Sequence, residues 1–115
     1  MNNELKSRLD QEIAGHPVVI YMKGTELFPR CGFSAAAIQA LQQAGAAGHI
    51  HSVDVLADPD LRDGIKAYSD WPTIPQIYVR GEFLGGADIV LEMHASGALR
   101  EKVEVALATA GPGTV

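Results

Sequence analysis

A run of five apolar residues, Val18-Val19-Ile20-Tyr21-Met22, constrains the fold of this chain more than any other feature. Branched and aromatic side chains favour a β-strand, and a strand that has no polar position is covered on both faces. Such a strand needs helices packed above and below its sheet. The chain has 115 residues, which is one domain of ordinary size, long enough to bury a core of this kind.

The patterns around this strand predict alternating helices and strands. Apolar residues spaced four apart over residues 5–13 predict a short amphipathic helix, which Gly15 and then Pro17 bring to an end. An alanine-rich helix is expected from residue 31 or 32 to the glycines at 45–48. The alternating segment 49–55 predicts a second strand.

The second half of the chain predicts one more helix, then a hairpin, then two helices. Asp58-Pro59 is typical of an N-cap followed by proline at the first helical position, in a helix that ends near Ser69. Residues 75–79 and 83–84 predict two strands joined by a tight turn. The last helices are expected at about residues 87–94 and 99–108.

This order of elements predicts the fold class. A βαβ unit followed by a β-hairpin forms a four-stranded mixed sheet flanked by helices on both faces. The fold is therefore α/β, with the layout of the thioredoxin fold and an extra N-terminal helix. We expect a single domain over residues 1–115, in which about residues 111–115 form a flexible tail.

Composition excludes several classes of partner. The formal net charge is −5, so the clustered cations that nucleic-acid binding needs are not expected. No apolar run approaches the roughly 18 residues that a membrane span requires, and the first residues lack the pattern of a secretory signal. A single cysteine indicates a reducing compartment. We therefore expect a cytoplasmic protein without a nucleic-acid or membrane partner.

The single cysteine, Cys31, is the first candidate for chemistry. It lies where a loop turns into a helix, so unpaired backbone N–H groups and the positive helix end favour its thiolate. Lys23 and Arg30 add positive charge nearby. The alternative is a buried and inert thiol, which the flanking cations argue against. We expect a reactive thiol with a pKa below the ordinary value of about 8.5.

Cys31 has no second thiol within its own chain. A C-x-x-C redox loop would place the other cysteine at position 34, where the sequence has Ser34. A hydroxyl cannot resolve a mixed disulfide, because oxygen does not replace the attacking sulfur. Ser34 is then either a hydrogen-bond donor to the thiolate or an ordinary first-turn residue. A functional Cys31 needs a sulfur atom from another molecule.

Two further segments are candidates for ligand contacts. In the segment 71–76, Pro75 belongs at the start of a strand, and the Ile74–Pro75 bond is open to two interpretations. A cis bond would offer the Ile74 backbone to a peptide, whereas a trans proline would form an ordinary turn. Gly85-Gly86 begins a helix whose free N–H groups suit a carboxylate. In the first turn of that helix, Asp88 either complements the helix dipole or accepts a hydrogen bond from the ammonium group of a ligand.

The four histidines do not predict a metal site. No His-x-x-x-His or mixed Cys/His spacing occurs, so a zinc site built by this chain alone is not expected.

Taken together, these motifs resemble those of the monothiol glutaredoxins. The matching segments, in the family's order and spacing over about residues 5–108, are Lys23-Gly24-Thr25, Cys31-Gly32-Phe33-Ser34, residues 71–76, and residues 81–86 followed by Asp88. The resemblance implies a thioredoxin fold, a cis bond before Pro75 and a groove that binds glutathione.

The resemblance also implies roles for individual residues. Cys31 is similar to the family's redox-active, cluster-binding thiolate, and Lys23 to the cation near that sulfur and the glutathione carboxylate. The remaining residues similar to the family's glutathione contacts are Arg62 and Lys66 for the glycine carboxylate, Thr73 and Ile74 with the adjoining Pro75 for the cysteinyl part, and Gly86, Ala87 and Asp88 for the γ-glutamyl end. Gln76 is a weaker match to the group at the glycine carboxylate.

Two positions depart from the family pattern. Glu26 stands where many relatives have proline, which leaves the loop before Cys31 freer to move. Ala87 stands where the family usually has cysteine or serine, so a hydroxyl or thiol near the γ-glutamyl group is missing. The second change affects the expected affinity for glutathione.

The function implied by the resemblance follows from counting ligands. A 2Fe–2S cluster is held by four soft ligands, usually thiolates, and this chain has one cysteine. Two Cys31 and two glutathione thiolates complete the set in a homodimer, so the family resemblance predicts a labile cluster delivered to recipient proteins and a role in iron homeostasis. Phe33 either shields this cluster or packs in the core.

Two other functions stay open. Cys31 could reduce mixed disulfides with glutathione as the resolving thiol, an oxidoreductase activity that the family resemblance predicts to be weak. The chain could also act as a binding module, since the family pairs with BolA-like proteins.

Overall fold

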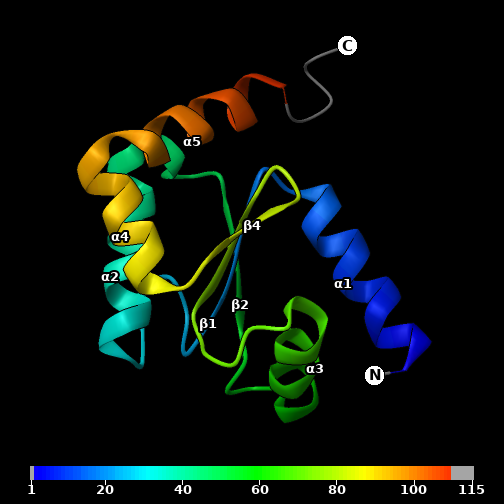
Figure 1. Cartoon of the computed structure of the whole chain (residues 1–115). Helices are drawn as coiled ribbons and strands as arrows, with labels where there is room; N and C mark the ends of the chain where they lie inside the picture. The colour runs from blue at the N-terminus through cyan, green and yellow to red at the C-terminus, as the bar shows by residue number, and fades with distance from the viewer. Residues whose placement is uncertain (1, 110–115) are drawn as a thin grey trace.

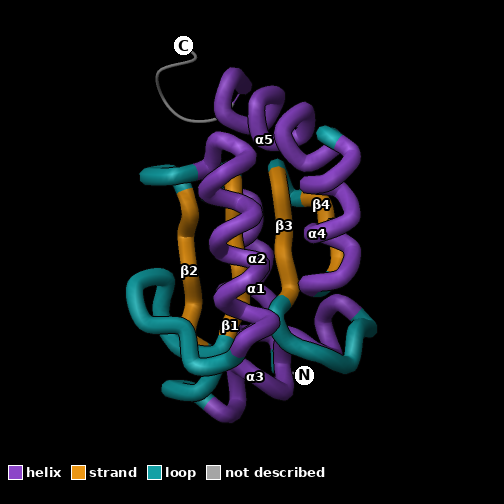
Figure 2. The backbone as a smooth tube through the Cα atoms, turned by 90° about the vertical axis from the view of Figure 1, so that its left-hand side faces the viewer, coloured by secondary structure: helices purple, strands orange, loops and turns teal. Residues whose placement is uncertain are grey.

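Strand β1 (Val18–Met22) lies at the centre of a four-stranded sheet, as its apolar sequence predicts. The computed structural model describes residues 2–109. The strand order is β2-β1-β3-β4, with β2 at Ile50–Asp54, β3 at Gln76–Val79 and β4 at Glu82–Gly85 (Figure 2). β1 pairs in parallel with β2 and antiparallel with β3, so the predicted mixed sheet is confirmed.

Helices cover both faces of the sheet. α1 (Asn3–Gly15) and α3 (Pro59–Ser69) lie on one face, and α2 (Gly32–Leu41), α4 (Ala87–Ser96) and α5 (Ala98–Thr109) lie on the other (Figure 1). The segment Gln42–Ala46 continues α2 with π-type turns and is kinked at Gly45, where φ is 106°, so the helix ends at the first of the predicted glycines. The element order matches the prediction, and the architecture is the thioredoxin fold with an added N-terminal helix.

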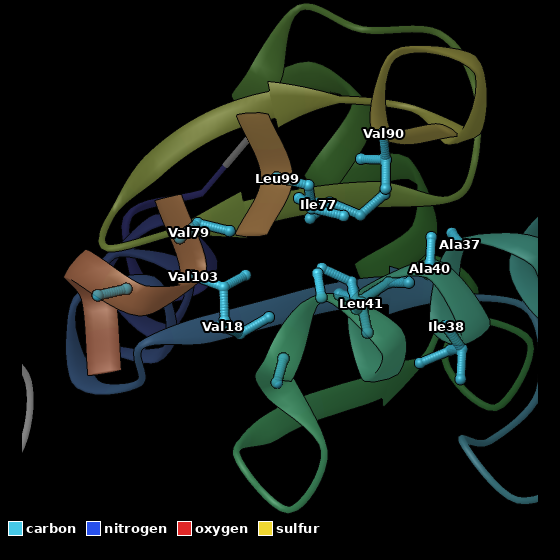
Figure 3. Packing of buried hydrophobic residues seen from close by; sticks show 14 of the residues in the cluster. Val18, Ala37, Ile38, Ala40, Leu41, Ile77, Val79, Val90, Leu99 and Val103 are labelled. Carbon is cyan, nitrogen blue, oxygen red and sulfur yellow. The ribbon is translucent and has the colours of Figure 1, made fainter. Parts of the chain in front are cut away.

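Each face of the sheet has its own hydrophobic core. The larger core lies between the sheet and α2, α4 and α5, where Leu41, Val90 and Leu99 pack toward Val18 and Ile77 (Figure 3). The second core joins α1 and α3 to the other face. All five β1 side chains have no exposed surface because both cores cover them.

Local sequence signals set the ends of the elements. Asp58 caps α3 by accepting a hydrogen bond from the Leu61 N–H at 3.2 Å, and Pro59 is the first helical residue, as expected. Arg80 and Gly81 have positive φ values of 52° and 78°, which gives the mirror-image turn that suits a two-residue hairpin.

Two expectations can be compared with the structure in detail. β2 was expected to alternate, but all five of its residues are partly buried because it is an edge strand. The Ile74–Pro75 bond is cis. The residues alone left this bond open between cis and trans, and the cis form confirms what the family resemblance implies. The predicted flexible tail lies outside the described residues. None of the helices in the described range 2–109 is long and apolar enough to cross a membrane.

Candidate functional site

A cleft of about 420 Å³ opens where β1 ends and where α2 and α4 begin. Its size suits a small ligand. The fold brings nine of the ten predicted site residues into its lining: Lys23, Cys31, Lys66, Thr73, Ile74, Pro75, Gly86, Ala87 and Asp88.

Cys31 is the N-cap residue of α2 and is partly exposed. The backbone of Ser34 donates a hydrogen bond that lowers the pKa of the Cys31 thiol, and the Phe33 backbone and the Lys23 charge lower it further. Partial desolvation opposes these effects. Of the two predicted cations, Lys23 acts on the thiol, whereas Arg30 supports the loop by donating its backbone N–H to the Lys23 carbonyl at 2.9 Å.

Ser34 is fully buried and connects the thiol to β1. Its Oγ accepts a hydrogen bond from the Lys23 N–H at 3.1 Å, which leaves the hydroxyl proton free for another acceptor. That side chain also hydrogen-bonds to Cys31 and helps lower its pKa. Both interpretations of Ser34 fit the structure, because it lies in the first turn of α2 and its side chain also helps to stabilise the thiolate.

The loop between Lys23 and Arg30 is held at several points. The Gly24 N–H donates to Asp54 Oδ1 at 2.9 Å. Gly24 has a φ of +90°, and a Cβ there would lie 2.5 Å from the Phe28 carbonyl oxygen, so glycine is required. Glu26, the departure from the family's proline, accepts a hydrogen bond from Gln42 at 3.1 Å. This contact ties the loop to the end of α2.

Two walls of the cleft offer backbone groups. One wall is the segment before β3, where the fully buried Gln76 donates from Nε2 to the carbonyl oxygens of Trp71 at 3.0 Å and Thr73 at 3.2 Å. Gln76 thus supports the wall and does not line the cleft. The other wall is the start of α4, whose N-cap Gly86 provides no side-chain cap. The N–H groups there suit a carboxylate, and Asp88 lies in the same first turn.

The structure changes the predicted set at five positions. Arg62 is outside the lining, and its Nε lies 4.0 Å from Asp63 Oδ1. Phe33 is 63% exposed, so of its two interpretations the core role is excluded. Phe33, Trp71, Pro72 and Ile89 also line the cleft, although none of them was assigned an individual contact with glutathione. Phe33, Trp71 and Pro72 lie inside the motifs matched by sequence, so those motifs could have indicated them. Ile89 lies outside the motifs and reaches the cleft because of the path of α4.

Comparisons with known proteins agree with this geometry. A profile of the glutaredoxin family matches residues 18–84. A Synechocystis protein described as an uncharacterized monothiol glutaredoxin, ycf64-like, is 51% identical over 109 residues, covering 95% of this chain and 100% of the relative.

Two poplar structures are also similar. The solution structure of reduced apo GrxS14 shares 48% identity and a TM-score of 0.78, covering 90% of this chain and 94% of that one. The crystal structure of the holo form of glutaredoxin C1 shares 25% identity and a TM-score of 0.81, covering 94% of both chains. With one thiol at the start of α2 and these similarities, the chain belongs to the glutaredoxin family, as a monothiol glutaredoxin.

Proposed function

We propose that this chain binds glutathione in the cleft and shares a labile 2Fe–2S cluster with a second copy, for transfer to recipient proteins and for iron homeostasis. One observation carries the proposal: a cysteine with a lowered thiol pKa opens into a cleft whose other groups match the charges of glutathione.

The groups of the cleft fit the parts of this tripeptide. Lys23 and Lys66 are cations suited to its glycine carboxylate. The Ile74 backbone, beside the cis bond to Pro75, suits strand-like pairing with the cysteinyl residue. The start of α4 and Asp88 suit the carboxylate and the ammonium of the γ-glutamyl end.

The cluster would be cargo held by thiolates from four molecules. Cys31 is the chain's one cysteine, and the described residues include no group of three or more His, Cys, Asp or Glu side chains placed to hold a metal ion. Four soft ligands therefore come from two Cys31 and two glutathiones. The solved holo form of poplar glutaredoxin C1 supports a bound group in a glutaredoxin of this fold. The exposed Phe33 would shield the cluster from water.

A BolA-like protein is the second proposed partner. A heterodimer would replace one pair of Cys31 and glutathione with ligands from that partner. A change in the visible spectrum of the cluster on mixing the two proteins is the expected sign of this exchange.

Anaerobic reconstitution tests the cluster. Protein incubated with iron, sulfide and glutathione should show visible charge-transfer absorption, elute as a dimer, and contain iron and glutathione each at a one-to-one ratio to chain. Cys31→Ser should lose the absorption, as should omission of glutathione. Ser7→Ala on α1, outside the cleft lining, serves as the matched control and should keep it. Reconstituted wild-type protein without visible absorption would refute the cluster proposal.

The lowered pKa of Cys31 also supports a second candidate, deglutathionylation. The Cys31 thiolate would attack the glutathione sulfur of a mixed disulfide and release the substrate thiolate. A second glutathione would then attack the resulting Cys31–glutathione disulfide, releasing glutathione disulfide and regenerating the thiolate. Steady-state turnover of a glutathionylated peptide separates the two functions, because rapid turnover without a stable cluster would favour the oxidoreductase.

A further inference from the structure

Among the residues that line the cleft, one buried polar side-chain atom has no hydrogen-bond partner within the described range 2–109. Trp71 lines the cleft, and its indole Nε1 is buried without a hydrogen-bond acceptor among the described residues. Buried tryptophan N–H groups usually have an acceptor, and an orphaned one needs a physical explanation.

The orientation of this indole is fixed by the fold. The Trp71 backbone N–H donates to the Lys66 carbonyl and to Ser69 Oγ, both at 3.2 Å. Its carbonyl accepts from Gln76 Nε2 at 3.0 Å. The ring packs edge-on against Phe83, with centroids 5.7 Å apart and an interplanar angle of 66°. The free N–H therefore belongs to an anchored residue.

The indole N–H lies next to a niche that exists because residue 86 is glycine. A Cβ at Gly86 would lie 3.3 Å from Trp71 Nε1, 3.4 Å from the Pro75 carbonyl oxygen and 4.0 Å from Thr73 Oγ1. All four residues line the cleft. The niche thus combines a donor, an acceptor and a hydroxyl.

The amino-acid group of a γ-glutamyl residue has matching chemistry. It carries a carboxylate, which accepts hydrogen bonds, and an ammonium, which donates them. Gly86 directly precedes Ala87 and Asp88, the residues proposed for the γ-glutamyl end. An acceptor from this end of the ligand would satisfy the indole N–H, and the Pro75 carbonyl would accept from the ammonium.

We propose that Trp71 recognises glutathione by donating its indole N–H to the γ-glutamyl carboxylate in the niche beside Gly86. This inference rests on the proposed binding of glutathione. It assigns a binding role to Trp71, which is neither one of the charged residues of the site nor its thiol.

Nuclear magnetic resonance tests the contact directly. Trp71 is the chain's one tryptophan, so the protein has a single indole N–H resonance. Glutathione should move this resonance and slow its hydrogen exchange. Cysteinylglycine, which lacks the γ-glutamyl group, should move the Cys31 amide and leave the indole unchanged. If glutathione moves the Cys31 and Asp88 amides but not the indole, this inference is wrong and glutathione binding stands. If no resonance moves, glutathione binding itself is refuted.

Calorimetry of three variants gives the energetic test. Trp71→Phe keeps a ring and removes the N–H, so glutathione should bind about tenfold more weakly. Gly86→Ala fills the niche and should also weaken binding. Tyr78→Phe removes a hydroxyl from a buried ring that packs on Phe83 outside the cleft lining, and it should bind like the wild type. Equal affinity of Trp71→Phe and wild-type protein for glutathione would overturn the inference. If Trp71→Phe does not fold, the shift of the indole N–H resonance in the wild-type protein decides the question.

Discussion

At the scale of single residues, the chemistry of Cys31 depends on the backbone N–H groups that are unpaired at the start of α2. As an N-cap, Cys31 faces the first N–H groups of α2, and the Ser34 and Phe33 backbones stabilise its thiolate. The Ser34 oxygen accepts a hydrogen bond from the Lys23 N–H, and its O–H remains available to donate toward the thiolate. The residue that replaces a resolving cysteine therefore stabilises the thiolate.

Two substitutions should raise the pKa of the Cys31 thiol. Lys23→Met removes the nearby positive charge and Ser34→Ala removes the hydroxyl donor, while the backbone donors remain. A higher pKa means less thiolate at neutral pH, so alkylation by iodoacetamide should be slower and its pH profile should move to higher pH. Lys6→Met, on α1, is the control and should match the wild type. Unchanged profiles for both cleft variants would contradict this explanation of the thiol.

At the scale of elements, α1 is the addition to the basic fold, and it is anchored through a few side chains. Leu9 has no exposed surface and Ile13 is 4% exposed, and both pack in the core shared with α3. The two helices approach closely at Gly64, where a Cβ would collide with the Leu5 side chain. α3 carries Lys66 into the cleft, so α1 supports one wall of the site from behind.

Leu9→Ala should lower the free energy of unfolding by about 2–5 kcal/mol, because it leaves a cavity under α1. Urea denaturation measures this loss. Gln11→Ala, an exposed position on the same helix, should stay within about 0.5 kcal/mol of the wild type. A loss for Leu9→Ala as small as that of the control would show that α1 is not packed as described.

At the scale of the whole molecule, the charges are separated. The chain has a net charge of −5, yet two lysines line the cleft beside the thiol. Away from the cleft, His16 and His51 stack with ring centroids 3.9 Å apart, and Glu12 lies 3.5 Å from His51 Nε2. These groups join the end of α1 to the edge strand β2.

Stability should fall on acidification because of His16. Burial and then the charge of His51 lower the pKa of His16, while Glu12 opposes the change. Since the unfolded chain keeps the ordinary value of 6.5, it binds more protons than the folded state as the pH falls below that value. The free energy of unfolding should therefore decrease below about pH 6.5, and less so in His16→Gln. Urea denaturation between about pH 8 and pH 5 checks this slope, and identical slopes in both proteins would contradict it.

The sequence by itself determined the elements and the placement of the thiol. The buried strand at residues 18–22, the Asp58-Pro59 helix start and the Arg80-Gly81 turn depend on neighbours close along the chain, so local patterns suffice to predict them. Cys31 at a helix start and the glycines before α4 were predictable for the same reason. The family motifs added the cleft residues and the cis bond, which local preferences could not decide.

Only the tertiary structure decided which side chains share the cleft and which polar groups stay unpaired. It excluded Arg62 from the lining of the cleft and included Ile89. It also left Phe33 exposed at the cleft and placed the Trp71 indole beside Gly86. It also paired Ser34 with the Lys23 backbone. These outcomes depend on contacts between separate elements, whose distances and burial are set when the helices pack on the sheet. The residue pattern along a single helix or strand does not predict those contacts.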